Sequence, residues 1–338
     1  MLDVFSTLVH RILDTLGHVL LAPGSLFSLW SLTAALVISA LFLLARKRMG
    51  PRLLLRALLP RKLWRSRSSR LDIGFFLLNT FVTGTLIGWA ILSFGGISHT
   101  ALDTARHLFG QSPLPVPPPM VRAGVLTLVL FLAYDFGYWF DHYLAHKIPL
   151  RWEFHRVHHT AEVLSPLTAY RMHPVDTLLF ANIVAAITGV ADGLTRYALG
   201  APVQEMAFSG TNVLLLVFAF TTIHLQHSHI DIRFTGWLGR VLFSPAHHHI
   251  HHSSKASHYD SNLGSCLAIW DHMFGTLVMP EPHERPGKYG AEAAPQDLND
   301  SDPHSAHGSL IAPFQRAGAQ LVRAVSARRS SRRLQPGE

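Results

Sequence analysis

The stretch from Asp141 to His159 reads DHYLAHKIPLRWEFHRVHH, and five of its residues are histidines. They fall into two clusters, His142 with His146 and then His155 with His158 and His159. Residues three and four positions apart lie on the same face of a helix, so each cluster would present its imidazoles on one side. Two such helices facing each other would form a cage of ring nitrogens.

A third dense cluster lies further along the chain, in the sequence PAHHHIHHSS around His247. It repeats the helical triplet with His248, His251 and His252. Between His142 and His258 the chain contains 15 of its 23 histidines. A single histidine is most often a hydrogen-bonded core or surface residue, but that interpretation does not explain so many at helical spacing. The pattern indicates metal binding, because imidazole is a common metal ligand.

The composition indicates an integral membrane protein. Of the 338 residues, 49% are hydrophobic and only 15% are charged, whereas soluble domains have roughly 25% charged residues. Lys and Arg exceed Asp and Glu by 29 to 21, but they concentrate in loops beside apolar segments, which is typical of membrane topology rather than of nucleic-acid binding. The single Cys266 excludes an intramolecular disulfide and a cysteine-rich zinc or iron–sulfur site.

The N-terminal third is predicted to contain two regions. Residues 1–26 have apolar positions at helical spacing interrupted by charges, which predicts an interfacial amphipathic helix. No basic segment precedes them, so we do not expect a cleaved signal peptide. Residues 27–120 are predicted to form transmembrane helices at Phe27–Ala45 and Ile73–Phe94. Ten basic and no acidic residues lie between Arg46 and Arg70, which predicts a cytoplasmic loop.

Residues 121–280 are predicted to form the domain that contains the histidine clusters, which the resemblance described below implies is catalytic, and 281–338 a mobile basic tail. Apolar segments at Val125–Trp139, Thr177–Gly193 and Met206–Ile223 read as spans. The last two would form a hairpin across the membrane, which returns the later histidines to the side of the first cluster. The expected fold is therefore an all-α integral membrane bundle, with a cytoplasmic, histidine-lined di-metal site capping the spans.

The number and type of ligands favour two iron ions. Eight histidines at helical spacing exceed the four ligands of a closed zinc site. No Glu-x-x-His pair of the kind found in soluble di-iron bundles occurs, so the site would be nearly all nitrogen. Zinc has no redox chemistry, whereas iron with O2 suits a site at the lipid boundary. A histidine-ligated haem electron carrier and a zinc-binding or metal-transporting membrane protein remain as alternatives.

From about Ala133 to Thr276 the chain resembles the sterol desaturase and fatty acid hydroxylase superfamily of membrane di-iron oxidases. The resemblance rests on ordered motifs: H-x3-H at His142, H-x2-HH at His155, R-x-HP at Arg171, the lone His227, P-x2-H-x2-HH at Pro245, D-x-N-x-G at Asp260 and WD-x3-GT at Trp270. It implies a non-haem centre of two iron ions that uses O2 and two electrons to hydroxylate or desaturate a lipid C–H bond.

The histidine spacing and the resemblance together give a set of site residues. The expected metal ligands are His142, His146, His155, His158, His159, His227, His248, His251 and His252. The residues expected to bind metal or to orient a ligand are His173, His224, His247, Asp260 and Asn262. Carboxylates expected to orient ligands are Asp135, Asp141, Glu153, Asp176, Asp260 and Asp271.

The chain departs from the family pattern in ways that leave the lipid substrate open. Many members have Arg after the first histidine, where this chain has Tyr143, and His224 with His227 is spaced by three. Hydroxylation and desaturation are not distinguished by these motifs.

A separate electron donor is expected. The chain has no G-x-G-x-x-G fingerprint, no set of four cysteines and no fused cytochrome b5-like HPGG segment. The predicted cytoplasmic face is basic through Arg46–Arg70, Arg151, Arg156 and Arg328–Arg333. An acidic ferredoxin or cytochrome b5, supplied by its reductase, would therefore be attracted to it. The other expected partners are the lipid substrate and the membrane, and no nucleic acid is expected.

Overall fold

The computed structural model describes residues 2–25, 27–47, 50–83, 91–112, 114–200, 202–281, 287–291 and 302–333. Its N-terminal part contains α1 (Leu2–Leu21), α2 (Leu29–Lys47), α3 (Pro51–Leu58), α4 (Lys62–Arg65), α5 (Arg67–Leu77), η1 (Leu78–Thr83) and α7 (Phe94–Phe109). The central part contains α8 (Pro119–Lys147), α9 (Pro149–His159), η3 (Pro166–Tyr170), α10 (Pro174–Leu199), β1 (Ala207–Phe208), β2 (Thr211–Asn212), α11 (Val213–Phe218), η4 (Ala219–Ile223) and α12 (His224–Gln226). The remainder contains α13 (Gly236–Val241), α14 (Pro245–His251), η5 (Ala256–His258), α15 (Ile269–Phe274), η6 (His307–Ile311) and α16 (Ala312–Arg333).

Three of the described helices are long and apolar enough to cross a membrane. They cover Leu29–Arg46 in α2, Pro119–Lys147 in α8 and Pro174–Leu199 in α10. The predicted all-α membrane fold is confirmed in this architecture, and α1 covers the segment predicted as the first amphipathic helix. The predicted interfacial position of α1 and the membrane side of the metal site stay predictions.

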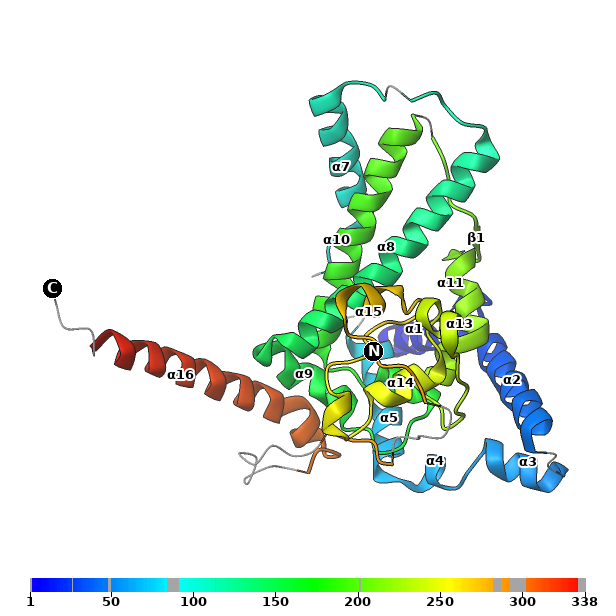
Figure 1. Ribbon diagram of the computed structural model, residues 1–338, viewed down its shortest axis with the longest axis vertical. Coiled ribbons are helices and arrows are strands. Elements are labelled where there is room, and N and C mark those ends of the chain that lie inside the picture. Colours follow the sequence, from blue (N-terminus) through cyan, green and yellow to red (C-terminus); the bar gives the residue numbers. More distant parts are fainter. Residues whose placement is uncertain are drawn as a thin grey trace.

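Helices α7, α8 and α10 form an upright group above the body of the molecule (Figure 1). Helix α10 packs against both others, and small residues allow the close approach to α7. A Cβ atom at Gly193 would collide with Ser98 O, and one at Gly189 would lie 2.9 Å from the Ile97 side chain. Helix α8 continues downward into the body, where it meets α9 and α15. The lower end of α8 is therefore where the site forms.

The predicted span Met206–Ile223 is corrected by the structure. A short hairpin of β1 and β2 occupies residues 207–212, with Gly210 at φ +79° in its turn. The apolar helix that follows covers only Val213–Gln226 and is shorter than the three spans. Asn212 ends the extended segment and caps α11 by accepting a hydrogen bond from Leu214 N, 3.0 Å away. The return from α10 is therefore not one continuous apolar helix, but the chain does come back to the first cluster, because His227 and His248 join His158 in one group.

The predicted span Ile73–Phe94 lies partly outside the described residues, because 84–90 are not among them. Its first part belongs to α5 and η1, and Phe94 begins α7. Asp72, just before it, is fully buried and accepts a hydrogen bond from Arg171 Nε at 2.6 Å. Arg171 also donates to Ser68 Oγ at 2.8 Å. Arg171, the arginine of the R-x-HP motif, thus connects α5 to the segment between α9 and α10.

The C-terminal region contains a long helix where the sequence analysis assigned none. Helix α16 extends away from the body toward the C-terminus, and its N-terminal half packs on α9 (Figure 1). Phe314 provides the contact, with its ring 5.2 Å from that of Phe154. The polar composition that follows Pro280 predicted a mobile segment, although Phe314, Ala317, Leu321 and Val325 recur at helical spacing.

Candidate metal centre

Prolines determine where the helices of the site begin. Pro149, Pro174 and Pro245 each stand at the first turn of α9, α10 and α14, where the missing N–H leaves no donor unsatisfied. Pro149 also ends α8, since proline cannot continue the preceding helix. The chain turns at Ile148, whose N–H closes α8 by donating to Leu144 O. This turn brings the histidines of α9 back against those of α8.

The first histidine group combines rings from α8, α9 and α14. Its members are His142, His146, His155, His159 and His251. One nitrogen of each lies within 4.8 Å of the others. In all five rings Nε2 is buried and has no hydrogen-bond partner among the described residues. Five unpaired nitrogens that converge in this way form a donor set for a cation.

The second histidine group lies beside the first and is fully buried. Its members are His158, His227, His248 and His252. Rings of the two groups touch, since the His159 and His252 rings stack with centroids 4.6 Å apart. Within the second group Nε2 faces Nε2, at 3.2 Å from His227 to His158, 2.8 Å from His248 to His227 and 3.0 Å from His252 to His248.

These nitrogen spacings fit metal ligation. Metal–nitrogen bonds of about 2.0–2.1 Å place neighbouring ligand atoms about 3 Å apart, which is the spacing in the second group. Hydrogen bonds alone do not account for it. The four Nε2 atoms form a chain of three contacts, and His227 and His248 each take part in two. A neutral imidazole nitrogen carries at most one proton, so one proton would have to serve two neighbours.

Burial keeps these rings unprotonated at neutral pH. Loss of hydration lowers the pKa of His227 to about 3, and it holds the pKa of His158, His248 and His252 well below the ordinary value. Burial also lowers the pKa of His159 and His251, and neighbouring histidines lower it further. Only the unprotonated ring binds metal, so protons do not compete for these nitrogens near pH 7.

Outer hydrogen bonds fix four of the five rings of the first group. His155 Nδ1 donates to Asp176 Oδ2 at 2.9 Å, and His146 Nδ1 donates to Asp260 Oδ1 at 3.3 Å. The remaining two partners are backbone oxygens, Leu263 O for His142 and Ser261 O for His251, both at 2.8 Å. A proton held on Nδ1 leaves the lone pair on Nε2, which therefore points inward.

The backbone acceptors belong to a loop that the D-x-N-x-G motif builds. Asp260 and Asn262 adopt left-handed backbone, at φ +55° and +54°, which these side chains tolerate better than most. Asn262 Nδ2 donates to His247 O at 3.1 Å, and its Oδ1 accepts from Val278 N at 2.7 Å. Asp271 accepts from the N–H groups of Leu263 and Gly264, each at 2.8 Å. The D-x-N-x-G motif and Asp271 of the WD-x3-GT motif thus shape the loop. Asn262 is not a member of either histidine group.

Three histidines expected near the metal lie outside both groups, and each has another role. His173 caps α10, because its Nδ1 accepts from Val175 N at 3.2 Å. His224 Nε2 contacts Ser31 Oγ of α2 at 2.9 Å. His247 Nδ1 contacts Ser244 Oγ at 2.7 Å in a capping box that starts α14. They position helices rather than meeting the converging nitrogens.

Among the carboxylates expected to orient ligands, only Asp176 and Asp260 contact a ring of the two groups. Asp135 accepts from Cys266 N at 2.8 Å and from Trp270 Nε1 at 2.9 Å, which ties α8 to the segment before α15. Asp141 pairs with Arg151 at 2.6 Å. The other two acceptors, the backbone oxygens of Leu263 and Ser261, were not predicted, because every residue has a carbonyl and its type does not mark it as an acceptor.

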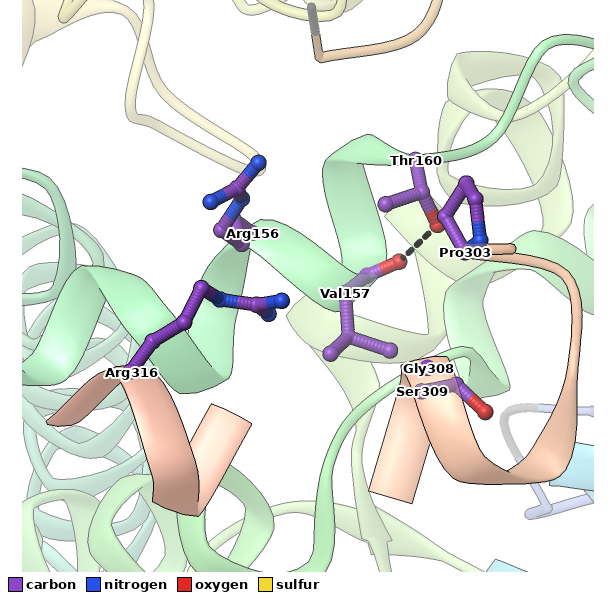
Figure 2. Close-up of a pocket in the computed structure, with 7 residues that line it drawn as sticks. All are labelled: Arg156, Val157, Thr160, Pro303, Gly308, Ser309 and Arg316. Carbon is purple, nitrogen blue, oxygen red and sulfur yellow. Dashed lines mark hydrogen bonds between the residues drawn. The ribbon is translucent and has the colours of Figure 1, made fainter. Parts of the chain in front are cut away.

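The C-terminal segment supports α9 from the side away from the histidines. Glu153 accepts from Arg316 Nε at 2.7 Å and from Gln320 Nε2 at 2.6 Å. Figure 2 shows Arg156 and Val157 of α9 near Arg316 and Ser309, around a cavity of about 20 Å³. A cavity of this size has room for about one water molecule. Helix α9, which supplies three of the nine rings, is thus held from both sides.

Comparisons with known proteins agree on the central region. Residues 127–276 match the Fatty acid hydroxylase family. The chain is 34% identical over 163 residues to ornithine lipid hydroxylase OlsE of Rhizobium tropici. The aligned segment covers 48% of this chain and 44% of that protein. It is 30% identical over 150 residues to alkylglycerol monooxygenase of Xenopus tropicalis, covering 44% of this chain and 29% of that protein.

A third relative is very-long-chain aldehyde decarbonylase GL1-9 of Oryza sativa subsp. indica, 26% identical over 192 residues, or 55% of this chain and 66% of that protein. No solved structure matches the chain significantly. The chain spans less than half the length of the first two relatives. The segment that matches the fatty acid hydroxylase family model contains all nine converging histidines, so the similarity covers the whole candidate metal centre.

Proposed function

We propose that this chain is an integral-membrane, non-haem di-iron oxidase that uses O2 and two electrons to hydroxylate or desaturate a C–H bond of a lipid. One observation carries the proposal. Nine histidines converge in two adjacent groups of five and four. Among the described residues, the five Nε2 atoms of the first group have no partner, and those of the second group contact one another. The names of the three relatives, which concern lipids or long-chain aldehydes, support a lipid as the substrate class.

The residues present fit two metal ions. The first group would hold one ion and the second group the other. When bound, the two iron ions would supply the O2 activation and hydrogen removal that no protein side chain can perform. The protein holds each ring in one orientation through the outer hydrogen bonds. It also limits water at the site, since Trp152 packs on the His146 and His159 rings at 5.0 and 5.3 Å.

The alternatives fit this geometry less well. A bis-histidine haem needs two rings on opposite sides of a wide macrocycle, whereas the Nε2 atoms of the second group are about 3 Å from one another. Zinc suits the four-membered group, since structural zinc takes four ligands. It does not account for five converging nitrogens in the first group. A zinc-binding protein is therefore the second candidate, and metal analysis distinguishes it from the first.

The experiment that tests the oxidase proposal compares lipids. The full chain is produced in host membranes with a ferredoxin or cytochrome b5 and its reductase, beside His155→Ala and the control His272→Ala. His272 is an exposed histidine of α15 outside both groups. We expect wild type and H272A to yield lipids that gain one oxygen atom or lose two hydrogen atoms, and H155A to yield none. Identical lipid profiles from all three proteins would refute the proposal.

We further propose that the metal centre faces the cytoplasm. The ten basic residues between Arg46 and Arg70 support this orientation. Tags near residue 60 and at the C-terminus should both report the cytoplasm, and a tag near Pro117 the opposite side. If the residue-60 tag reports the outside, the orientation is wrong.

The same basic surface supports an acidic electron carrier as a separate partner. With the carrier limiting, turnover should fall as salt rises, because screening weakens attraction between exposed charges. Sustained turnover with NADPH and no second protein would refute a separate donor.

A further inference from the structure

Two cavities lie at the end of α7, α8 and α10 that is remote from the histidines. One, of about 480 Å³, lies between α7 and α10 and is lined by Ser98, Arg106 and Asp192 among others. The other, of about 500 Å³, is bordered by Arg122 near the start of α8. Arg196 and Pro202 line both, so the two cavities adjoin. Each has the size of a small-molecule site.

These cavities are not part of the metal centre. Arg122 precedes His142 by about 20 residues on the same helix, a separation of roughly 30 Å. That length equals the thickness of a bilayer core. Since α8 and α10 are candidate spans, cavities at this end lie at the level of the lipid headgroups of the leaflet remote from the histidines.

The charge lining the cavities is mainly positive. Arg106, Arg122 and Arg196 line the cavities together with one carboxylate, Asp192. Arg196 pairs with Asp192, and Arg106 lies 3.8 Å from Asp103 of its own helix. Arg122 is held in place because its guanidinium donates to Pro202 O at 2.9 Å. Its Nε is buried and has no partner among the described residues. An arginine with an unused, buried donor suits a phosphate oxygen.

Asp192 adds a second requirement for a ligand, a hydrogen-bond donor. Asp192 is 2% exposed, and its Oδ2 accepts from Ser98 Oγ at 2.5 Å and from Arg196 Nε at 2.7 Å. Its Oδ1 is buried without a partner in the described part of the chain. A buried acceptor left unpaired is costly. A ligand that fits therefore carries a hydrogen-bond donor as well as an anion.

We propose that these joined cavities bind the headgroup of a phospholipid that carries a free donor. The phosphate would meet Arg122, with Arg106 adding positive charge from the adjoining cavity, and a hydroxyl or ammonium group would meet Asp192 Oδ1. Basic pockets between membrane helices are suited to such headgroups. Phe94 and Leu102, which also line the first cavity, offer apolar surface to an acyl chain. The headgroup would lie roughly 30 Å from the histidines along α8, too far for it to be the group that is oxidised.

The test uses the purified full chain in nanodiscs of phosphatidylcholine mixed with phosphatidylethanolamine or phosphatidylglycerol, and native mass spectrometry counts the retained lipid. Phosphatidylcholine has a phosphate but no N–H or O–H donor. We expect the two donor-bearing lipids to be retained about tenfold better than phosphatidylcholine, since a hydrogen bond to a charged group corresponds to at least that factor.

The double variant R106Q/R122Q should lose most of this retention, whereas R240Q, an exposed arginine of α13 that lines neither cavity, should keep it. Unchanged metal content in both shows that the protein is folded and separates this test from the proposed oxidase activity. If D192N folds, it should lose the preference for donor-bearing lipids. Equal retention of all three lipids, or full displacement by inorganic phosphate, would overturn the proposal.

Discussion

The two histidine groups lie side by side, yet different structures hold their rings. In the first group, carboxylates and loop carbonyls orient four rings through Nδ1, as with His155 and Asp176 at 2.9 Å. In the second group, Nδ1 of His158, His248 and His252 has no partner among the described residues. The Nε2 atoms of this group instead contact one another.

This difference indicates that the first group is preorganised and that the second group becomes ordered when it binds its ion. Rings fixed by outer hydrogen bonds keep their orientation without metal, whereas rings that face only each other have less to hold them. The first group should therefore keep its geometry in the metal-free protein. The second should order fully only when an ion replaces the contacts between its nitrogens.

Removing one ring from either group should give the largest effect. H155A and H248A should each bind half of the wild-type iron or less and lose all detectable turnover, because the reaction needs both ions. Both proteins should still insert in membranes, since His155 and His248 lie outside the three apolar spans. Iron analysis and activity assays check this. Full activity in either variant would remove that ring from the set of ligands.

Removing an outer partner should have a smaller effect that is specific to the first group. D176N weakens the acceptor for His155, and loss of such a partner typically lowers metal affinity 10–100-fold. D260N should lower it less, because the His146–Asp260 contact is longer, at 3.3 Å, and Asp260 is partly exposed. Metal titration with a competing chelator measures both. Equal effects would show that the contact geometry does not matter.

Metal removal should separate the two groups directly. His227 follows α12 directly, and His248 and His252 lie in α14 and directly after it. After chelation we expect amide hydrogen exchange to rise about tenfold or more in α12 and α14, and less in α8 and α9. The reason is that local opening follows the loss of the contacts that hold a segment. Uniform change across all four helices would contradict the division into a preorganised half and an ion-dependent half.

Weakening the support behind α9 should give the smallest effect. Q320A removes one of the two bonds from α16 to Glu153, while the bond from Arg316 remains. We expect a loss of metal affinity of only a few-fold, because a single hydrogen bond contributes about 1 kcal/mol. The control is Q204A, far from α9. No change in affinity would show that α16 does not position the site.

Features that depend on local periodicity, such as helices and the residues on one helix face, could be predicted from the sequence. Eight of the nine converging histidines follow helical spacing, whereas His227 was expected only from the family resemblance. Helices α1 and α2 follow apolar patterns, so their positions were also accessible. Asp176 was predictable only as one of several carboxylates. Which of them reaches a ring depends on how α10 packs near α9, and spacing along the chain does not determine that.

Other features depend on tertiary contacts that residue types do not reveal. The apolar segment after residue 206 looks continuous, but the turn at Gly210 makes it a short hairpin and a short helix. His173 was expected to bind metal or to orient a ligand, yet its ring accepts the hydrogen bond from Val175 N and so caps the N-terminus of α10. The carbonyls of Ser261 and Leu263 reach His251 and His142 only in the folded loop, so the sequence did not identify them as partners.

The most direct test of the central claim is the metal content of the purified full chain, measured by elemental analysis together with its absorption spectrum. The proposed di-iron centre predicts two iron ions per chain without a haem band, and loss of iron in both H155A and H248A. Zinc in place of iron, a single iron ion per chain, or a haem spectrum would contradict it.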